Sequence, residues 1–522
     1  MSEPAEYKTY NSSNRTVHFW AVGAIADYYM YGVFAMIPVF FVNTFGMNPF
    51  MVSVALVLPR LVDGFADPII GHWSDNTHTR WGRRRPFLLG SVLMGACLIM
   101  GIWWMSPTWN EWAQFFWVLM GSMLLFLCWG AYSMNHLALG YELTDDYHQR
   151  TKVIAVRGFY FACAAMTGGF FYLIAGLQQL PREILGLHFH TIYNWISGPT
   201  LFPTGTSVGN FYHWAAGVHL FPNRIVGMRI ESVFIAAAAL VAAIFTITFA
   251  RERFAKANRK HVNIMQALKA TMKVKPFLIL LGAAMIGSLG GTFYATFAFY
   301  IGVYSVCQGD MQLYNALPAY NGIIGVTCSF LLVFLAARLS RAIGKRHGLI
   351  MNYGILFLSA CLMPFFARPG WPYLLLAQMI IFGPVLGTLF NVFVGAMMPD
   401  ICDLDELQSG ERREGLFSAV QSFVSKVQNS LCYLLSGYVL MLSGFDAKHA
   451  AALPPIPQTP EVVERMRWMG FTPAIIFSGL AFLFIWLYPV TEKKMAEVRA
   501  QLEARRRSGQ AQEGPESEVM AK

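Results

Sequence analysis

The chain has 522 residues, of which 56% are hydrophobic and only 13% are charged, and its formal net charge is +10. A soluble protein carries charge on roughly a quarter of its residues, so this composition excludes an ordinary soluble domain. The basic excess does not require a nucleic-acid partner, because Lys and Arg cluster in short segments between long apolar runs. We therefore expect a membrane protein with no nucleic-acid partner.

Apolar runs of about 20 residues recur along the chain, and each is long enough for a helix to cross ~30 Å of hydrocarbon. These runs lack the alternation of apolar and polar residues that strands of a membrane barrel show. We predict twelve spans: 17–44, 50–73, 86–106, 113–141, 153–177, 229–250, 276–305, 315–338, 348–368, 372–397, 415–444 and 470–490. The predicted fold class is therefore an all-α membrane protein with twelve transmembrane helices.

The basic segments all fall on one side of the predicted membrane. The loop 75–86 carries Arg80, Arg83, Arg84 and Arg85, and the central segment 251–275 and the tail 491–522 are also rich in Lys and Arg. Basic loops stay in the cytoplasm. We predict cytoplasmic N- and C-termini and a plasma membrane location, which in a bacterium is the inner membrane. The long opposite loop, 178–228, is a candidate cap on the external mouth.

An internal repeat divides the chain into two six-helix halves. Basic turns follow the second and eighth spans, and acidic-then-basic turns, YELTDDYHQRTK and MMPDICDLDELQSGERREG, follow the fourth and tenth. Two six-span halves describe the major facilitator architecture, whose binding site lies near the middle of the membrane between the halves. We predict an N-terminal half over 1–250, a central cytoplasmic loop over 251–275, a C-terminal half over 276–490 and a cytoplasmic tail over 491–522.

Two carboxylates share one face of the second span. Asp63 and Asp67 are four residues apart, and Arg60 lies on the same stripe. A charged residue in the middle of a membrane costs roughly 2.5–3.5 kcal/mol. Because two ionised carboxylates repel, the pair favours a bound cation or a proton. For Arg60, a packing role as a counter-charge to a neighbouring aspartate is an equal alternative.

Further polar residues fall inside other spans: Asp27, His136, Arg157 and Lys426. A carboxylate and a guanidinium that face one cavity can bind hydroxyl-rich or anionic substrates, while the alternative is an ion pair that packs helices together. His136 is open between a proton carrier, a substrate ligand and a hydrogen-bonded core histidine. Lys426 could neutralise the aspartates when no cation is bound.

The segments DGFADPIIG (63–71) and RWGRRRP (80–86) resemble the second-span signature of the glycoside–pentoside–hexuronide:cation symporters. AIADYYMYG (24–32) is similar to the first span of that family, and residues 397–430 are similar to its loop and eleventh span. The resemblance to the melibiose permeases implies cation-coupling roles for Asp63, Asp67, Lys426 and, more loosely, Ser133. It also implies substrate-binding roles for Asp27 and Arg157.

The chain departs from that pattern at several positions. Ala66 stands where the sodium-using permeases have an asparagine, which favours a proton over Na⁺ as the coupling ion. If the ion is Na⁺, Asp63 and Asp67 are its expected ligands. His136 replaces a second sugar-binding aspartate, Gly140 replaces a tryptophan, and Asn391 replaces another tryptophan. His136 and Asn391 are therefore candidate substrate contacts, and we expect a changed substrate.

These features predict a secondary transporter that carries a sugar, glycoside or sugar acid together with H⁺ or Na⁺, by alternating access and as a monomer. We expect no cofactor and no enzymatic activity, because the sequence contains no nucleotide-binding loop and no hydrolase motif. The arginines of loop 80–85 could close a cytoplasmic gate by pairing with Asp145 or Asp146, or could serve topology alone. The alternative function is a cation-coupled carrier of a lysophospholipid or another amphipathic substrate.

Overall fold

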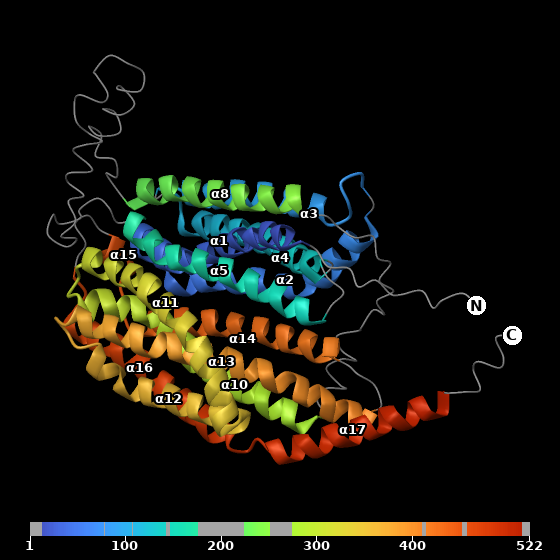
Figure 1. Cartoon of the computed structure of the whole chain (residues 1–522). Helices are drawn as coiled ribbons and strands as arrows, with labels where there is room; N and C mark the ends of the chain where they lie inside the picture. The colour runs from blue at the N-terminus through green and yellow to red at the C-terminus, as the bar shows by residue number, and fades with distance from the viewer. Residues whose placement is uncertain are drawn as a thin grey trace, which may run out of the picture.

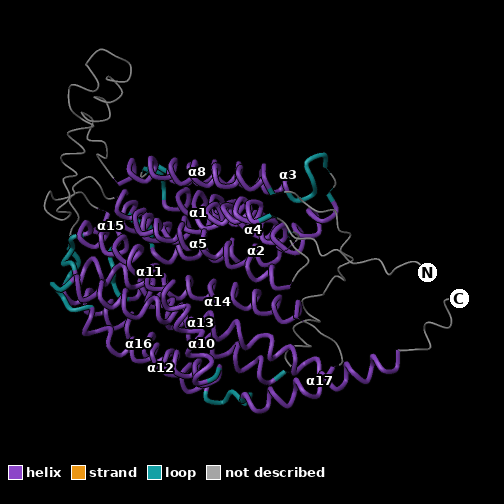
Figure 2. The backbone as a smooth tube through the Cα atoms, viewed as in Figure 1, coloured by secondary structure: helices purple, strands orange, loops and turns teal. Residues whose placement is uncertain are grey.

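The structure, a computed structural model, describes residues 13–77, 79–106, 108–141, 143, 147–175, 224–250, 274–409, 414–451 and 457–513. Within these ranges the regular elements are helices, apart from one isolated bridge between Thr79 and Gly82 (Figure 2). The candidate cap over 178–228 lies outside the described residues except for its last five positions. The central segment lies outside them up to residue 273.

The twelve predicted spans are confirmed as twelve long helices in the described part of the chain. Six come from the first half of the sequence: α1 (Asn14–Phe45), α2 (Pro49–Asn76), α3 (Arg85–Gly101), α4 (Glu111–Tyr141), α5 (Tyr147–Ala175) and α8 (Arg224–Phe249). Six come from the second half: α10 (Lys275–Tyr300), α11 (Met311–Ile343), α12 (Lys345–Phe366), α13 (Pro372–Ser409), α14 (Glu414–Leu442) and α16 (Pro460–Ile485). The remaining elements are η1 (Ile102–Trp104), a π-helical turn (Ile301–Val306), the short α15 (Ala447–Ala451) and the polar helix α17 (Glu492–Glu513).

The helices pack as two six-helix halves in the major facilitator fold, one above the other in Figure 1. In the first half α1 packs on α4, α5 and α8, and in the second α10 packs on α14 and α16. Between the halves, α2 packs on α14 and α5 packs on α11. We call the face where α1 begins and α17 lies the terminal face, and the face where α1 ends and α15 lies the distal face.

The helices between the halves are also the least hydrophobic ones. Over their whole length α2, α5, α11 and α14 carry more polar residues than the other eight helices, although all twelve match predicted spans. Polar side chains on a membrane helix are costly when they face lipid. In α2 and α14 two such residues, Asp63 and Lys426, pair with each other between the halves.

A three-residue connection on the distal face, 46–48, shows how local sequence ends one helix and starts the next. Gly46 ends α1 with a positive φ of 67°, a conformation that glycine adopts without strain. The side chain of Asn48 then accepts a hydrogen bond from the backbone N–H of Phe50 at 2.9 Å, and Pro49 fills the first helical position of α2. Gly46 thus supplies the positive φ that ends α1, and Asn48 and Pro49 supply the cap and the first residue of α2. The two helices can therefore be joined by a short connection.

The two halves approach each other closely on the distal side of the membrane. A Cβ atom added at Gly437 in α14 would lie 2.7 Å from the carbonyl oxygen of Pro49, and one added at Gly322 in α11 would lie 2.7 Å from the carbonyl oxygen of Met166. Tyr304 also donates a hydrogen bond to Asn43 across the halves at 3.2 Å. The distal side is therefore closed, and glycine is required where the backbones meet.

On the terminal face, α17 is fastened to the second half by buried charge. The carboxylate of Asp400 in α13 lies 2.7 Å from Nζ of Lys345 and 2.6 Å from Nη2 of Arg499, which belongs to α17. The Asp400 side chain is only 7% exposed, so both basic groups compensate a carboxylate that has lost most of its water. The buried side chains of Met495 and Val498 add apolar contact along the same helix.

Candidate functional site

An ion pair between α1 and α5 forms the centre of the first half. Nη2 of Arg157 lies 2.5 Å from Oδ2 of Asp27. The Asp27 side chain is 4% exposed, whereas that of Arg157 is 20% exposed. The structure therefore brings together the two residues for which the resemblance implies substrate binding. A carboxylate with a partly open guanidinium offers both acceptors and donors to a hydroxyl-rich or anionic molecule.

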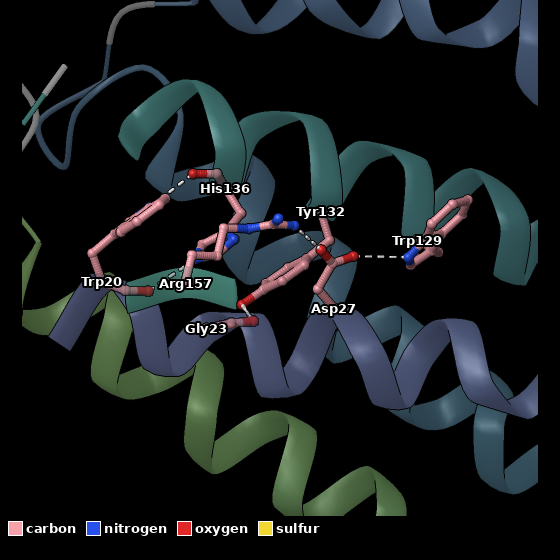
Figure 3. Close-up of polar contacts among 7 residues, drawn as sticks. All are labelled: Trp20, Gly23, Asp27, Trp129, Tyr132, His136 and Arg157. Atoms are coloured by element: carbon pink, nitrogen blue, oxygen red, sulfur yellow. Dashed lines mark hydrogen bonds and ion pairs between the residues drawn. The ribbon is translucent and has the colours of Figure 1, made fainter. Parts of the chain in front are cut away.

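The other oxygen of Asp27 is held by a tryptophan that the sequence did not single out. The indole Nε1–H of Trp129 in α4 donates to Oδ1 of Asp27 at 2.9 Å (Figure 3). Hydrogen bonds to an ionised carboxylate are stronger than those between neutral groups. Trp129 and Arg157 thus approach the carboxylate from two different helices and fix its orientation.

His136 has the environment of a hydrogen-bonded core histidine. It is fully buried, its Nε2 lies 2.9 Å from the carbonyl oxygen of Trp20, and its own carbonyl accepts a hydrogen bond from Trp20 Nε1 at 2.8 Å. Its ring is stacked between those of Trp20 and Tyr132, with centroid separations of 5.0 and 5.7 Å. Because the Trp20 carbonyl only accepts, Nε2 carries the proton, and the packing leaves the ring little freedom to approach a substrate.

Gly140 is explained by the same packing. A Cβ atom at this position would lie 2.0 Å from Cζ2 of Trp20. The tryptophan that the family pattern has at this point of α4 is therefore replaced in space by a tryptophan from α1. Trp20 is fully buried, so it contributes to the core of the first half and not to an open aromatic platform.

A second ion pair links the two halves near the middle of α2 and α14. Nζ of Lys426 in α14 lies 2.9 Å from Oδ2 of Asp63 in α2, and the Asp63 side chain is 1% exposed. The side chain of Asp67 lies outside the described part of the chain, although its backbone belongs to α2. The arrangement places a lysine where a cation would otherwise compensate Asp63.

Within the described residues the charged group paired with Asp63 is Lys426, and the described contacts of Arg60 are with aromatic rings. Its guanidinium carbon lies 5.8, 5.3 and 5.6 Å from the ring centroids of Tyr31, Phe126 and Trp129. These distances are typical of cation–π contacts. Arg60 is 6% exposed, and we call the three rings around it the aromatic seat. The sequence offered no signal for this seat, because aromatic residues are common throughout the apolar runs.

Ser133 and Asn391 lie apart from the two ion pairs. Ser133 is half-buried on α4, one turn beyond Trp129, and its hydroxyl makes no hydrogen bond within the described residues. Asn391 is exposed on α13, and its Nδ2 donates to the carbonyl of Gly387 on its own helix at 2.8 Å. The contacts that the structure describes thus do not join Asn391 to the Asp27–Arg157 pair.

The arginines after α2 have different surroundings. Nε of Arg85 donates to the carbonyl oxygen of Ala250, just past the end of α8, at 3.0 Å, and a second guanidinium nitrogen contacts the same oxygen. A cation at the carboxyl end of a helix is stabilised by the helix dipole. Arg80 is exposed and Arg84 is buried. The predicted gate partners Asp145 and Asp146 lie outside the described residues.

Comparisons with known proteins agree with this architecture. The family model described as MFS/sugar transport protein matches residues 19–492. The chain is 23% identical to the glucuronide carrier protein homolog of Escherichia coli, over 94% of this chain and 96% of that protein. It is 22% identical to the isoprimeverose transporter of Lactiplantibacillus pentosus, over 88% of this chain and 85% of that protein.

Among solved structures, the crystal structure of a bacterial homologue of the human lysosomal transporter Spinster matches with a TM-score of 0.61 at 15% identity, over 93% of this chain and 99% of that one. Such low identity supports the fold alone. The match to the family model spans all twelve long helices, from α1 to α16, and supports a transport protein and not an enzyme. The chain therefore belongs to the MFS/sugar transport protein family, as a multi-pass membrane transporter.

Proposed function

We propose that this transporter carries a sugar, glycoside or sugar acid across the membrane together with a proton, by alternating access. The observation that carries the proposal is the buried ion pair between Asp63 and Lys426, which joins the two halves through a residue that a cation can replace. The transport role itself follows from the family. The substrate class and the coupling ion are the proposal.

The ion pair gives a physical route from cation binding to movement. When a proton neutralises Asp63, or a cation occupies its carboxylate, Lys426 loses the attraction of that carboxylate, and the attraction between α2 and α14 falls. A buried positive charge that is less well compensated is costly, so Lys426 then favours a conformation in which water reaches it. Cation binding therefore changes which arrangement of the halves is stable, as coupled transport requires.

Ala66 supports a proton as the coupling ion, with Na⁺ as the alternative. Sodium is a hard cation that prefers several oxygen ligands, and Ala66 supplies none from the helix turn between Asp63 and Asp67. A proton needs only one carboxylate. If Na⁺ is carried instead, Asp63 and Asp67 are the ligands we propose for it.

For the substrate, the Asp27–Arg157 pair supports a molecule with hydroxyl groups, and the partly exposed guanidinium also suits a carboxylate. The relatives named as a glucuronide carrier homolog and an isoprimeverose transporter are consistent with this chemistry. We place the terminal face in the cytoplasm, because it carries the basic loop after α2. The described conformation is then closed on the external side.

Uptake into proteoliposomes tests the proposal. Radiolabelled methyl β-D-glucuronide, glucuronate, xylose disaccharides and lysophosphatidylcholine are offered with an imposed pH gradient or an imposed Na⁺ gradient. We expect a sugar or sugar acid to accumulate with the pH gradient, and we expect a protonophore to abolish that accumulation.

Two variants separate coupling from binding. Asp63→Asn should lose accumulation but keep exchange of internal for external sugar, whereas Arg157→Gln should lose both. Full gradient-driven uptake by Asp63→Asn would refute the coupling role. Uptake of lysophosphatidylcholine in place of every sugar would refute the substrate class.

A further inference from the structure

Trp129 contacts both parts of the candidate site. Its Nε1–H donates to Asp27 at 2.9 Å, and the face of its ring lies 5.6 Å from the guanidinium carbon of Arg60. In the described part of the chain, Trp129 is the side chain that contacts both Asp27 and Arg60. The two contacts use different parts of one rigid indole, so a rotation that alters one also alters the other.

The aromatic seat holds Arg60 in a fixed place. Tyr31 lies against Trp129 with a centroid separation of 5.1 Å, and Phe34 stacks on Phe126 at 3.6 Å. Phe34 and Phe126 are almost fully buried, so the floor of the seat is part of the core. Tyr31 and Trp129 are partly exposed and form its open wall. This open wall is the part that a change at Asp27 can move.

Arg60 and Asp63 are three residues apart in α2, a spacing at which a guanidinium and a carboxylate on a helix can pair. Instead, Arg60 lies over the rings, and the cation on Asp63 is Lys426 from the other half. An arginine beside Asp63 would favour the ionised carboxylate and would compete with a proton or a cation. The aromatic seat therefore keeps the permanently charged guanidinium of Arg60 from competing with a proton or cation for Asp63, the proposed coupling site.

We propose that Trp129 is a positioning residue that links the substrate and cation sites, by withholding Arg60 from Asp63 while Asp27 fixes the orientation of the indole. This inference rests on the proposed function for the meaning of the two sites. A substrate bound to Asp27 changes which atom accepts the hydrogen bond from the indole N–H of Trp129. The indole then shifts within the aromatic seat, and this changes how strongly Arg60 competes with a proton or cation for Asp63. The link needs no movement of the helix backbones.

Labelling of Asp63 by dicyclohexylcarbodiimide tests the link without any sugar or gradient. This reagent modifies protonated carboxyl groups in apolar surroundings, and mass spectrometry of peptides separates Asp63 from Asp67. In Trp129→Leu, the released Arg60 reaches Asp63, so labelling should slow by about tenfold or more. In Arg60→Gln Trp129→Leu, the competitor is absent, so labelling should return to the rate of Arg60→Gln alone.

That rescue distinguishes positioning from general damage, because a disordered bundle is not repaired by a second substitution. Tyr31→Leu removes another part of the open wall without touching Asp27 and keeps the test available if Trp129→Leu does not fold. It should also slow the labelling of Asp63. Unchanged labelling in both single variants would overturn the proposal, as would slow labelling that persists when Arg60 is removed.

The contact with Asp27 is tested separately. Asp27→Ala and Trp129→Phe each remove the hydrogen bond, and Trp129→Phe keeps a ring over Arg60. Both should slow labelling several-fold, and the double variant should be no slower than the slower of the two, because they act through one contact. Additive effects would overturn the link to Asp27. Failure of cation-driven uptake in wild-type vesicles would count against the proposed function alone, since these arms use no transport.

Discussion

Gly437 should control how strongly the distal side stays closed. An added Cβ would lie 1.7 Å from Oγ of Ser53 and 2.7 Å from the carbonyl oxygen of Pro49, whereas ordinary contacts begin at about 3.4 Å. The serine hydroxyl can rotate away, but the Pro49 carbonyl belongs to the backbone of α2. The substitution Gly437→Ala therefore forces α2 and α14 apart by several tenths of an ångström in the described conformation.

Such overpacking costs about 1–3 kcal/mol, and the cost disappears when the distal side opens. A difference of this size shifts the equilibrium between closed and open states by about 5- to 150-fold. Spin labels at Glu111→Cys and Lys448→Cys report the change, because these exposed residues lie on opposite halves with 3.6 Å between their charged atoms. We expect Gly437→Ala to raise the long-distance population in double electron–electron resonance, in a background without the native cysteines.

Gly158→Ala is the matched control, because an added Cβ on this α5 glycine has nothing within 4 Å. It changes helix propensity by the same amount without a steric clash. Replacing Glu111 and Lys448 with labelled cysteines itself changes the stability of the closed state little, because an exposed ion pair contributes about 0–1 kcal/mol. Identical distance distributions for Gly437→Ala and Gly158→Ala would refute the argument that the close approach of α2 and α14 sets the closure.

Three further substitutions follow from buried contacts. Lys426→Ala leaves Asp63 without its cation at a cost of about 3–5 kcal/mol, so the melting temperature should fall, and adding Asp63→Asn should recover most of the loss. Asp400→Asn weakens the attachment of α17, so limited proteolysis should remove that helix faster than in the wild type. Gly140→Ala places a Cβ 2.0 Å from the Trp20 ring, so it should lower the melting temperature more than Gly158→Ala does.

The apolar runs predicted the number and order of the spanning helices, and several of these helices extend well beyond the predicted spans. α13 continues to Ser409, whereas its predicted span ended at 397, and α16 begins at Pro460, whereas its predicted span began at 470. Hydropathy reports the part of a helix that lies in hydrocarbon. Backbone hydrogen bonding continues beyond the membrane until a cap or a helix-breaking residue stops it, so the polar segment DICDLDELQS remains helical.

The site shows a different limit. Asp27 and Arg157 stood out because charged residues are rare in apolar spans, and they were predicted as substrate contacts, with a packing ion pair as the alternative; the structure joins them at 2.5 Å. The roles of Trp20 and Trp129 could not be predicted, because tryptophan carries no comparable signal in a chain with 14 of them. Gly140 appeared as a lost aromatic residue, although an aromatic ring from another helix fills that space. Compensation between helices is visible only after the chain has folded.

The lower hydrophobicity of the four helices between the halves also explains why the fold can carry a moving interface. α2 packs on α14 and α5 packs on α11 between the halves, and the Asp63–Lys426 pair is buried where α2 and α14 meet. A fully apolar interface would resist opening to water, because exposed apolar area costs about 25 cal/mol per Å². Ion pairs such as Asp63–Lys426 are less costly to hydrate than to leave unpaired in an apolar core. The polar residues of these four helices therefore lower the cost of exchanging contact between the halves for contact with water.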